Sequence, residues 1–229
     1  MKESPIIIAL DVDSVHEARR LVRTLGDSAG FYKVGMELYA AAGKEFVREL
    51  IGEGKQVFFD QKYYDIGETV KRATALVAKT GVRFLTVHAQ SSVVRAAVQG
   101  RGESGLKVLA ISVLTSFDES DLSLDGYPCT VADLVERRTR NAIVAGADGI
   151  VCSAREVARV RRVAGPRALL VTPGVRSEGT AKGDQKRVAT PAEAIRDGAD
   201  YVVIGRQVTR SADPKSEVAR IVDEIAASV

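Results

Sequence analysis

Two acids and an amine stand close together just after an apolar run in the segment 58–70, FFDQKYYDIGETV. Asp60 and Lys62 are two residues apart, and Asp65 follows three residues later. In a strand, residues i and i+2 point to the same face, so the first acid and the amine are predicted to lie side by side. Alternating carboxylates and ammoniums hold one another charged in a site that excludes water. The spacing therefore indicates a catalytic charge network, with a purely structural ion-pair network as the alternative.

Polar residues also stand at the ends of other apolar runs. Lys33 lies inside such a run and must reach water or a carboxylate, because an unpaired buried charge is costly. Asp11 is not needed as a helix cap, since Ser14 can fill that role. His88 is a lone histidine, for which a hydrogen-bonded structural role is favoured over a functional one. The residues at these positions are Asp11, Lys33, Asp60, Lys62, His88, Thr115, Ser116, Arg176, Gly205 and Arg206.

Short apolar runs alternate with segments of helical period along the chain. The eight runs predicted to be strands are Ile6–Leu10, Phe31–Val34, Val57–Phe59, Phe84–Val87, Val108–Val113, Gly149–Cys152, Leu169–Thr172 and Tyr201–Ile204. Capping boxes beginning at Ser14 and Thr190 mark two helix starts. Eight βα units predict an α/β fold, a single (β/α)8 TIM-barrel domain spanning residues 1–229. A doubly wound open sheet is the alternative, although no Gly-x-Gly-x-x-Gly follows any of the runs.

A barrel brings the strand ends to one mouth, and its last two loops usually bind phosphate. Gly205 and Arg206 follow the eighth run, where a glycine lets a backbone N–H approach an anion and an arginine adds donors. The segment 173–187, PGVRSEGTAKGDQKR, is long and rich in glycine and charge. It is predicted to be a lid that contacts the anion through Arg176 and Gln185, with a disordered surface loop as the alternative.

The composition is that of a soluble globule. The chain has 229 residues, of which 45% are hydrophobic and 28% charged, with a formal net charge of +3. Its arginine clusters lie in helical patterns with little aromatic interleaving, which favours solvated helix faces over nucleic-acid binding. No apolar run approaches the roughly 18 residues of a membrane span, and the first run is too short for a signal peptide. A cytoplasmic protein without membrane or nucleic-acid partners is therefore expected.

Taken together, these residues resemble the orotidine 5′-monophosphate decarboxylase family of bacterial-type short chains, whose reaction is the last step of de novo UMP synthesis. The family motif Asp-x-Lys-x-x-Asp-Ile-x-x-Thr is matched at residues 60–69. TPGVR at 172–176, GDQKRV at 183–188 and LTS at 114–116 are also family-like. The likeness runs from ALDVD at 9–13 to IGR at 204–206. It implies a TIM barrel, a homodimer with shared active sites, a nucleotide substrate, and neither metal nor organic cofactor.

The resemblance also assigns roles to residues. Lys62 is implied to donate the proton, beside Asp60, and Lys33 and Asp65 complete the catalytic set, with Asp65 reaching in from the other subunit. The implied substrate-binding residues are Asp11, Lys33, Asp60, Lys62, Asp65, Ile66, Thr69, Thr115, Arg176, Gln185, Gly205 and Arg206. Asp11 and Lys33 would hold ribose hydroxyls, and Thr115 would contact the base. The 5′-phosphate would be held by Arg176, Gln185, Gly205 and Arg206.

The chain departs from the commoner family pattern at three positions, and two other functions stay open. Gln61 stands where leucine is usual, and Gly67-Glu68 where Pro-Asn is frequent. An unsatisfied amide at Gln61 would cost about 1–3 kcal/mol. One alternative function is a related sugar-phosphate decarboxylase or aldolase that uses Mg²⁺. The other is a catalytically silent nucleotide-binding barrel.

Overall fold

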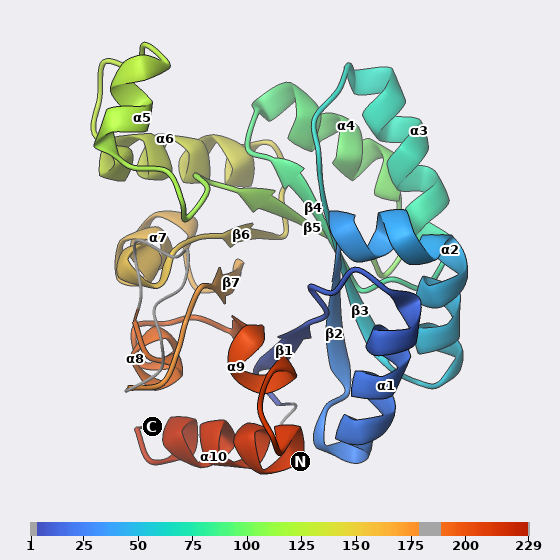
Figure 1. The fold of residues 1–229 in the computed structure, drawn as a ribbon. Helices are drawn as coiled ribbons and strands as arrows, with labels where there is room; N and C mark the ends of the chain where they lie inside the picture. The colour runs from blue at the N-terminus through green and yellow to red at the C-terminus, as the bar shows by residue number, and fades with distance from the viewer. Residues whose placement is uncertain (1–3, 179–188, 229) are drawn as a thin grey trace.

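The computed structural model describes residues 4–178 and 189–228, and within them eight parallel strands close into a barrel (Figure 1). Each strand pairs with the next in chain order, and β8 pairs back with β1. The strands are β1 (Ile6–Ala9), β2 (Phe31–Gly35), β3 (Gln56–Tyr63), β4 (Phe84–His88), β5 (Lys107–Ile111), β6 (Gly149–Val151), β7 (Leu169–Pro173) and β8 (Tyr201–Ile204). This arrangement confirms the predicted (β/α)8 fold and rules out the open sheet.

Helices connect the strands on the outside of the barrel (Figure 1). They are α1 (Val15–Leu25), η1 (Gly26–Ser28), α2 (Met36–Gly52), α3 (Gly67–Ala78), α4 (Ser91–Arg101), α5 (Glu119–Leu124), α6 (Val131–Val144), η2 (Ala154–Glu156), α7 (Val157–Ala164), α8 (Pro191–Arg196), α9 (Arg206–Thr209) and α10 (Pro214–Ala226), where η marks a 3-10 helix. Ser14 caps α1 by accepting from Glu17 N–H, and Thr190 and Glu193 form a complete capping box on α8. None of these described helices is long and apolar enough to cross a membrane.

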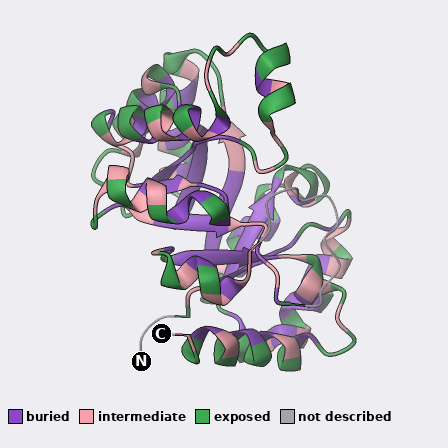
Figure 2. Ribbon diagram, turned by 90° about the vertical axis from the view of Figure 1, so that its left-hand side faces the viewer, coloured by how far each residue is buried: buried purple, intermediate pink, exposed green. Residues whose placement is uncertain are grey.

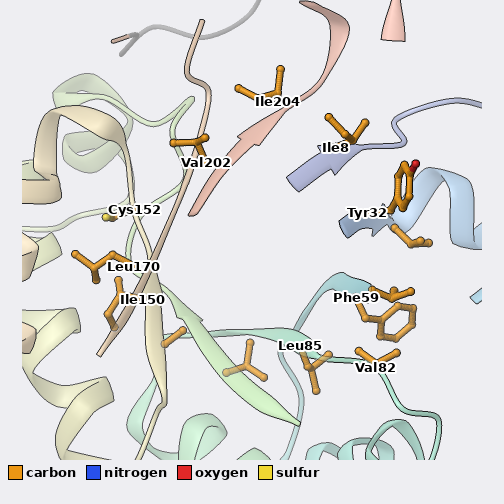
Figure 3. Packing of buried hydrophobic residues seen from close by; sticks show 14 of the residues in the cluster. Ile8, Tyr32, Phe59, Val82, Leu85, Ile150, Cys152, Leu170, Val202 and Ile204 are labelled. Atoms are coloured by element: carbon orange, nitrogen blue, oxygen red, sulfur yellow. The ribbon is translucent and has the colours of Figure 1, made fainter. Parts of the chain in front are cut away.

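Apolar side chains pack in two layers separated by the strands. The larger layer lies between the strands and the helices, and Figure 3 shows part of it, with Ile8, Tyr32 and Leu85 among its members. The smaller layer fills the barrel interior and consists of Ile7, Ala9, Phe31, Phe58, Phe84, Leu109, Val171, Tyr201 and Val203. Neighbours along a strand alternate between the two layers, as Ile7 and Ile8 do. The strands are therefore buried on both faces, whereas the outer faces of the helices are exposed (Figure 2).

The interior layer determines where the polar mouth of the barrel begins. Lys33 follows the interior residue Phe31 by two positions, and Asp60 follows Phe58 in the same way. The same two-residue step leads from Ala9 to Asp11, from Phe84 to Thr86 and from Val203 to Gly205. Side chains two apart share a face of a strand, so these residues lie above the apolar layer at the carboxyl ends of the strands.

One strand is longer and less regular than predicted. β3 continues to Tyr63, so Asp60 and Lys62 lie within the strand rather than after it. Phe59 pairs with Leu85 and Tyr63 pairs with Val87, which places three residues of β3 opposite a single residue of β4. Lys62 has φ 50°, the only positive φ of a non-glycine residue in the described ranges. The strand therefore bulges at the charged residues, and the simple alternation used in the prediction does not describe this segment.

Candidate active site

A cavity of about 440 Å³ opens at the carboxyl ends of the strands. Residues from seven of the eight strands or the loops that follow them contribute to its walls. The lining residues are Ala9, Asp11, Lys33, Asp60, Lys62, Ile111, Val113, Leu114, Thr115, Val151, Cys152, Pro173, Gly174, Val175, Arg176, Val203, Gly205, Arg206, Gln207 and Arg210. In residues 4–178 and 189–228, no group of three or more His, Cys, Asp or Glu is placed to hold a metal ion.

Four charged side chains form a continuous chain along one wall of the cavity. Lys33 Nζ lies 2.7 Å from Asp11 Oδ1 and 3.6 Å from Asp60 Oδ2. Lys62 Nζ donates a hydrogen bond of 2.8 Å to the same Asp60 Oδ2. Acid and amine therefore alternate, and each ammonium is compensated by a carboxylate. The side chain of Lys33 is only 11% exposed, which is tolerable because it has two carboxylate partners.

Asp60 is the centre of this network and is almost fully buried. Burial by itself raises the pKa of its carboxyl group, but the charges of Lys33 and Lys62, with hydrogen bonds from Lys62 and Thr86, outweigh that effect. The pKa of Asp60 therefore lies below its usual value, and the carboxylate stays ionised at neutral pH. An ionised, desolvated acid beside an ammonium provides strong local electric fields for catalysis.

Part of the cavity wall is basic and rich in glycine. Arg176, Arg206 and Arg210 all line it, together with Gly174 and Gly205. A Cβ at Gly205 would lie 3.7 Å from Ala9 Cβ, an ordinary contact distance, so packing alone does not require glycine there. The backbone at these glycines and the three guanidinium groups can therefore bind an anion in the same cavity that the Lys62 ammonium lines.

One family model matches the amino-acid sequence of this chain. That model is described as orotidine 5′-phosphate decarboxylase / HUMPS family, and it matches residues 4–221. The chain belongs to this family.

Curated relatives and solved structures agree with this assignment. An orotidine 5′-phosphate decarboxylase from Rhodopseudomonas palustris (strain HaA2) is 52% identical, over 96% of this chain and 94% of that protein. One from Nitrobacter winogradskyi is 50% identical, over 96% of this chain and 92% of that protein. The crystal structure of orotidine 5′-phosphate decarboxylase from Lactobacillus acidophilus superposes with a TM-score of 0.87 at 34% identity, covering 97% of this chain and 99% of that one.

The predicted residues divide into those that meet at the cavity and those that do not. The predicted residues that line it are Asp11, Lys33, Asp60, Lys62, Thr115, Arg176, Gly205 and Arg206. Asp65, Ile66 and Thr69 of the family motif are not among the lining residues. Asp65 Oδ1 instead accepts a hydrogen bond of 2.6 Å from Ile66 N–H at the entry to α3. Gln185 and most of the predicted lid, 179–187, lie outside the described residues.

Polar residues at the strand ends were predicted to converge on one pocket, but two of them, His88 and Ser116, do not line the main cavity. His88 lies at the end of β4, yet it lines a separate cavity of about 430 Å³ near α6. Burial lowers its pKa, and the charges of Arg138 and Lys62 lower it further, so the imidazole is neutral at neutral pH. Ser116 does not line the main cavity either.

Gln61, one of the positions that depart from the commoner family pattern, has a hydrogen-bond partner. Its amide donates to Val34 O at 3.3 Å, so it does not carry the energetic penalty of an unsatisfied buried group.

Among the residues that were not predicted from the sequence, Gln207, Arg210 and Thr86 have hydrogen-bonding side chains at or beside the charged part of the site. Gln207 and Arg210 line the cavity from α9 and its C-cap, a helix too short to show a periodic pattern. Gln207 also holds the base of the predicted lid, since its amide accepts from Ser177 N–H at 3.2 Å and donates to Ser177 Oγ at 2.9 Å. Thr86, on β4, donates to Asp60 Oδ1 at 2.9 Å. Its position two residues after Phe84 was the available signal, but threonine is too common in strands for that to stand out.

Proposed function

We propose that this chain decarboxylates orotidine 5′-monophosphate to UMP and CO2, the last step of de novo UMP synthesis. The observation that carries the proposal is the Lys62 ammonium, hydrogen-bonded to a buried, ionised Asp60 in a cavity that three arginines also line. The names of relatives about 50% identical over nearly the whole chain support the substrate. The cavity thus offers the two things this substrate needs, a cation at the reacting carbon and donors for a phosphate.

The proposed chemistry needs a cation where negative charge develops. When the bond between C6 and the carboxylate breaks, its electron pair stays on C6, in the ring plane, where no π system delocalises it. The Lys62 ammonium stabilises that charge and then donates its proton to C6, giving UMP. Asp60 lies against the departing carboxylate, keeps the ammonium charged and orients it. Neither metal nor organic cofactor enters the proposed mechanism.

Other lining residues bind the parts of the substrate that do not react. Asp11 and Lys33 hold ribose hydroxyl groups, and Thr115 contacts the base. The phosphate is held by Arg176, Gly205 and Arg206, with Gln185 completing that set from outside the described residues. Binding energy gained at this remote phosphate can close the site around the ring and so contribute to the rate.

A second copy of the chain completes the site in this proposal. Asp65, Ile66 and Thr69 lie beside the mouth of their own barrel but outside its cavity. Ile66 is 73% exposed, and the nearby Tyr64 is 62% exposed. If two barrels pack mouth to mouth around a two-fold axis, the exposed apolar residues are covered and Asp65 reaches the partner's Lys62. The proposed assembly is therefore a homodimer with shared active sites.

The test is to follow the absorbance of orotidine 5′-monophosphate with purified protein and EDTA. Turnover that persists with EDTA is expected. Turnover of a sugar phosphate that needs added Mg²⁺ would instead favour the alternative enzyme, and UMP binding without turnover would favour the silent barrel. Lys62→Ala is expected to lose at least about 10³-fold in kcat while UMP binds within a few-fold of wild type. Lys79→Ala, at an exposed lysine beyond α3, is the matched control and should keep full activity.

A further inference from the structure

Thr86 stands alone opposite the bulge of β3. Leu85 pairs with Phe59 and Val87 pairs with Tyr63, so Thr86 is the one residue of β4 that faces the segment 60–62. It is fully buried, and it does not line the cavity. A bulge interrupts the regular hydrogen-bond ladder between two strands, so the backbone groups of the bulged residues need other partners.

The Thr86 hydroxyl provides such a partner and uses both of its hydrogen-bonding capacities. Its oxygen accepts a hydrogen bond of 2.9 Å from Lys62 N–H. The same group donates a hydrogen bond of 2.9 Å to Asp60 Oδ1. The other oxygen of that carboxylate, Oδ2, accepts from Lys62 Nζ. The Thr86 hydroxyl group therefore links the backbone of Lys62 to the side chain of Asp60.

We propose that Thr86 is a positioning residue for the decarboxylation, whose hydroxyl holds the Lys62 backbone at positive φ and orients the Asp60 carboxylate toward the Lys62 ammonium. A non-glycine residue keeps such a backbone conformation only when its surroundings enforce it. Without the hydroxyl, Lys62 N–H loses its acceptor and Asp60 Oδ1 loses a donor. The ammonium is then free to leave the position where negative charge develops. This inference rests on the proposed function.

Three variants separate positioning from packing. Thr86→Val keeps the shape of the side chain but removes the hydroxyl, whereas Thr86→Ser keeps the hydroxyl but removes the methyl group. A packing role predicts that the serine variant is the more impaired, and a positioning role predicts the opposite order. Thr172→Val is the matched control, because Thr172 is also fully buried on a barrel strand, and its hydroxyl has no hydrogen-bond partner among the described residues.

The first measurement is steady-state kinetics with orotidine 5′-monophosphate. Thr86→Val is expected to lower kcat by about 10- to 100-fold, because misplacement of a reacting group by about 1 Å costs that much. KM should change by less than about threefold, since Thr86 does not line the cavity. Thr86→Ser and Thr172→Val should stay within about threefold of wild type. If Thr86→Val does not fold, Thr86→Ala removes the same hydroxyl and takes its place in the comparison with serine.

The second measurement needs no turnover and is an NMR titration of the Asp60 carboxyl carbon. The charged groups that face Asp60 are Lys33 from β2 and Lys62 from its own strand, with Asp11 acting through Lys33. Those groups are unchanged in the variants. The hydrogen bond from Thr86 lowers the pKa of Asp60. Its loss in Thr86→Val should therefore move the titration of Asp60 to higher pH, whereas Thr86→Ser keeps the bond and should titrate like the wild type.

The outcomes distinguish this inference from the proposed function. A wild-type protein without decarboxylase activity would refute the function, and the NMR titration would still report on the Asp60–Thr86 contact. An active wild type together with a fully active Thr86→Val variant would overturn the positioning role. A serine variant more impaired than the valine variant would overturn it as well, in favour of packing.

Discussion

At the scale of single residues, the site concentrates features that are costly for stability. Lys33 and Asp60 are charged and nearly buried, and Lys62 adopts a backbone conformation that is unfavourable for a residue with a side chain. Buried ion pairs stabilise proteins little, because desolvation offsets most of the Coulomb attraction. Strained backbone and buried charges of this kind cluster at functional sites in proteins. These features support the proposal that catalysis takes place at the bulge of β3.

The phosphate assignment makes a prediction about Arg206. Arg206→Ala should weaken UMP binding by about 10- to 100-fold, because a hydrogen bond to a charged group contributes about 1.5–3 kcal/mol. Uridine, which lacks the phosphate, should bind the variant and the wild type within about twofold. Calorimetric titration with both ligands measures the difference. Arg95→Ala removes the same charge from the exposed face of α4 and serves as the control. Equal weakening of UMP and uridine would contradict the assignment.

At the scale of secondary-structure elements, the position of α3 determines where the second half of the motif lies. α3 begins at Gly67, directly after Asp65 and Ile66. It packs against α4 at Gly100, where an added Cβ would lie only 2.1 Å from the backbone oxygen of Lys71. The two helices therefore approach more closely than any residue with a side chain allows. This contact fixes α3 against α4, and Asp65 lies just before the first residue of α3.

Gly100→Ala is accordingly expected to destabilise the protein. Overpacking typically costs about 1–3 kcal/mol, and here the clash is with backbone rather than with a flexible side chain. The free energy of unfolding in urea should fall by at least that amount. Gly52→Ala, at the end of α2, meets nothing within 4 Å and should be neutral or stabilising by up to about 1 kcal/mol. Equal stability of the two variants would show that the helices can separate without penalty.

The elements themselves could be predicted from the sequence, whereas the irregular segment could not. All eight strands were found because their residues are buried on both faces and form continuous apolar runs. The bulge of β3 was missed because it depends on the register with β4, which no local pattern encodes. For the same reason the hydrogen bonds of Thr86 were not foreseen. His88, for which a structural role was favoured, lies outside the main cavity, and the centre of its ring lies 5.2 Å from that of Tyr64, just beyond the bulge.

At the scale of the whole molecule, the barrel mouth combines a charged cavity with exposed apolar side chains. Met36, Tyr64 and Ile66 are all more than half exposed, and they follow the ends of the neighbouring strands β2 and β3. Leu76 on α3, Leu124 on α5 and Val144 on α6 are also more than half exposed, but Figure 1 shows these helices on the outside of the barrel. Large apolar side chains gathered at one place on a surface favour a protein–protein contact there. Covering the mouth with a second copy would also bring Asp65 to a site that it does not reach in its own subunit.

Mixing two inactive variants tests this shared site. Lys62→Ala and Asp65→Ala homodimers should each be nearly inactive. After dissociation and random reassociation, half of the dimers are mixed, and in each of these one site carries both lesions while the other carries neither. About a quarter of wild-type activity should therefore return. As a control, the Lys62→Ala variant is mixed with an Asp60→Asn variant. Asp60 and Lys62 line the same cavity of one subunit, so every site in a mixed dimer carries one lesion and no activity should return. If the Asp65 mixture also stays inactive while mass spectrometry confirms mixed dimers, Asp65 acts within its own subunit.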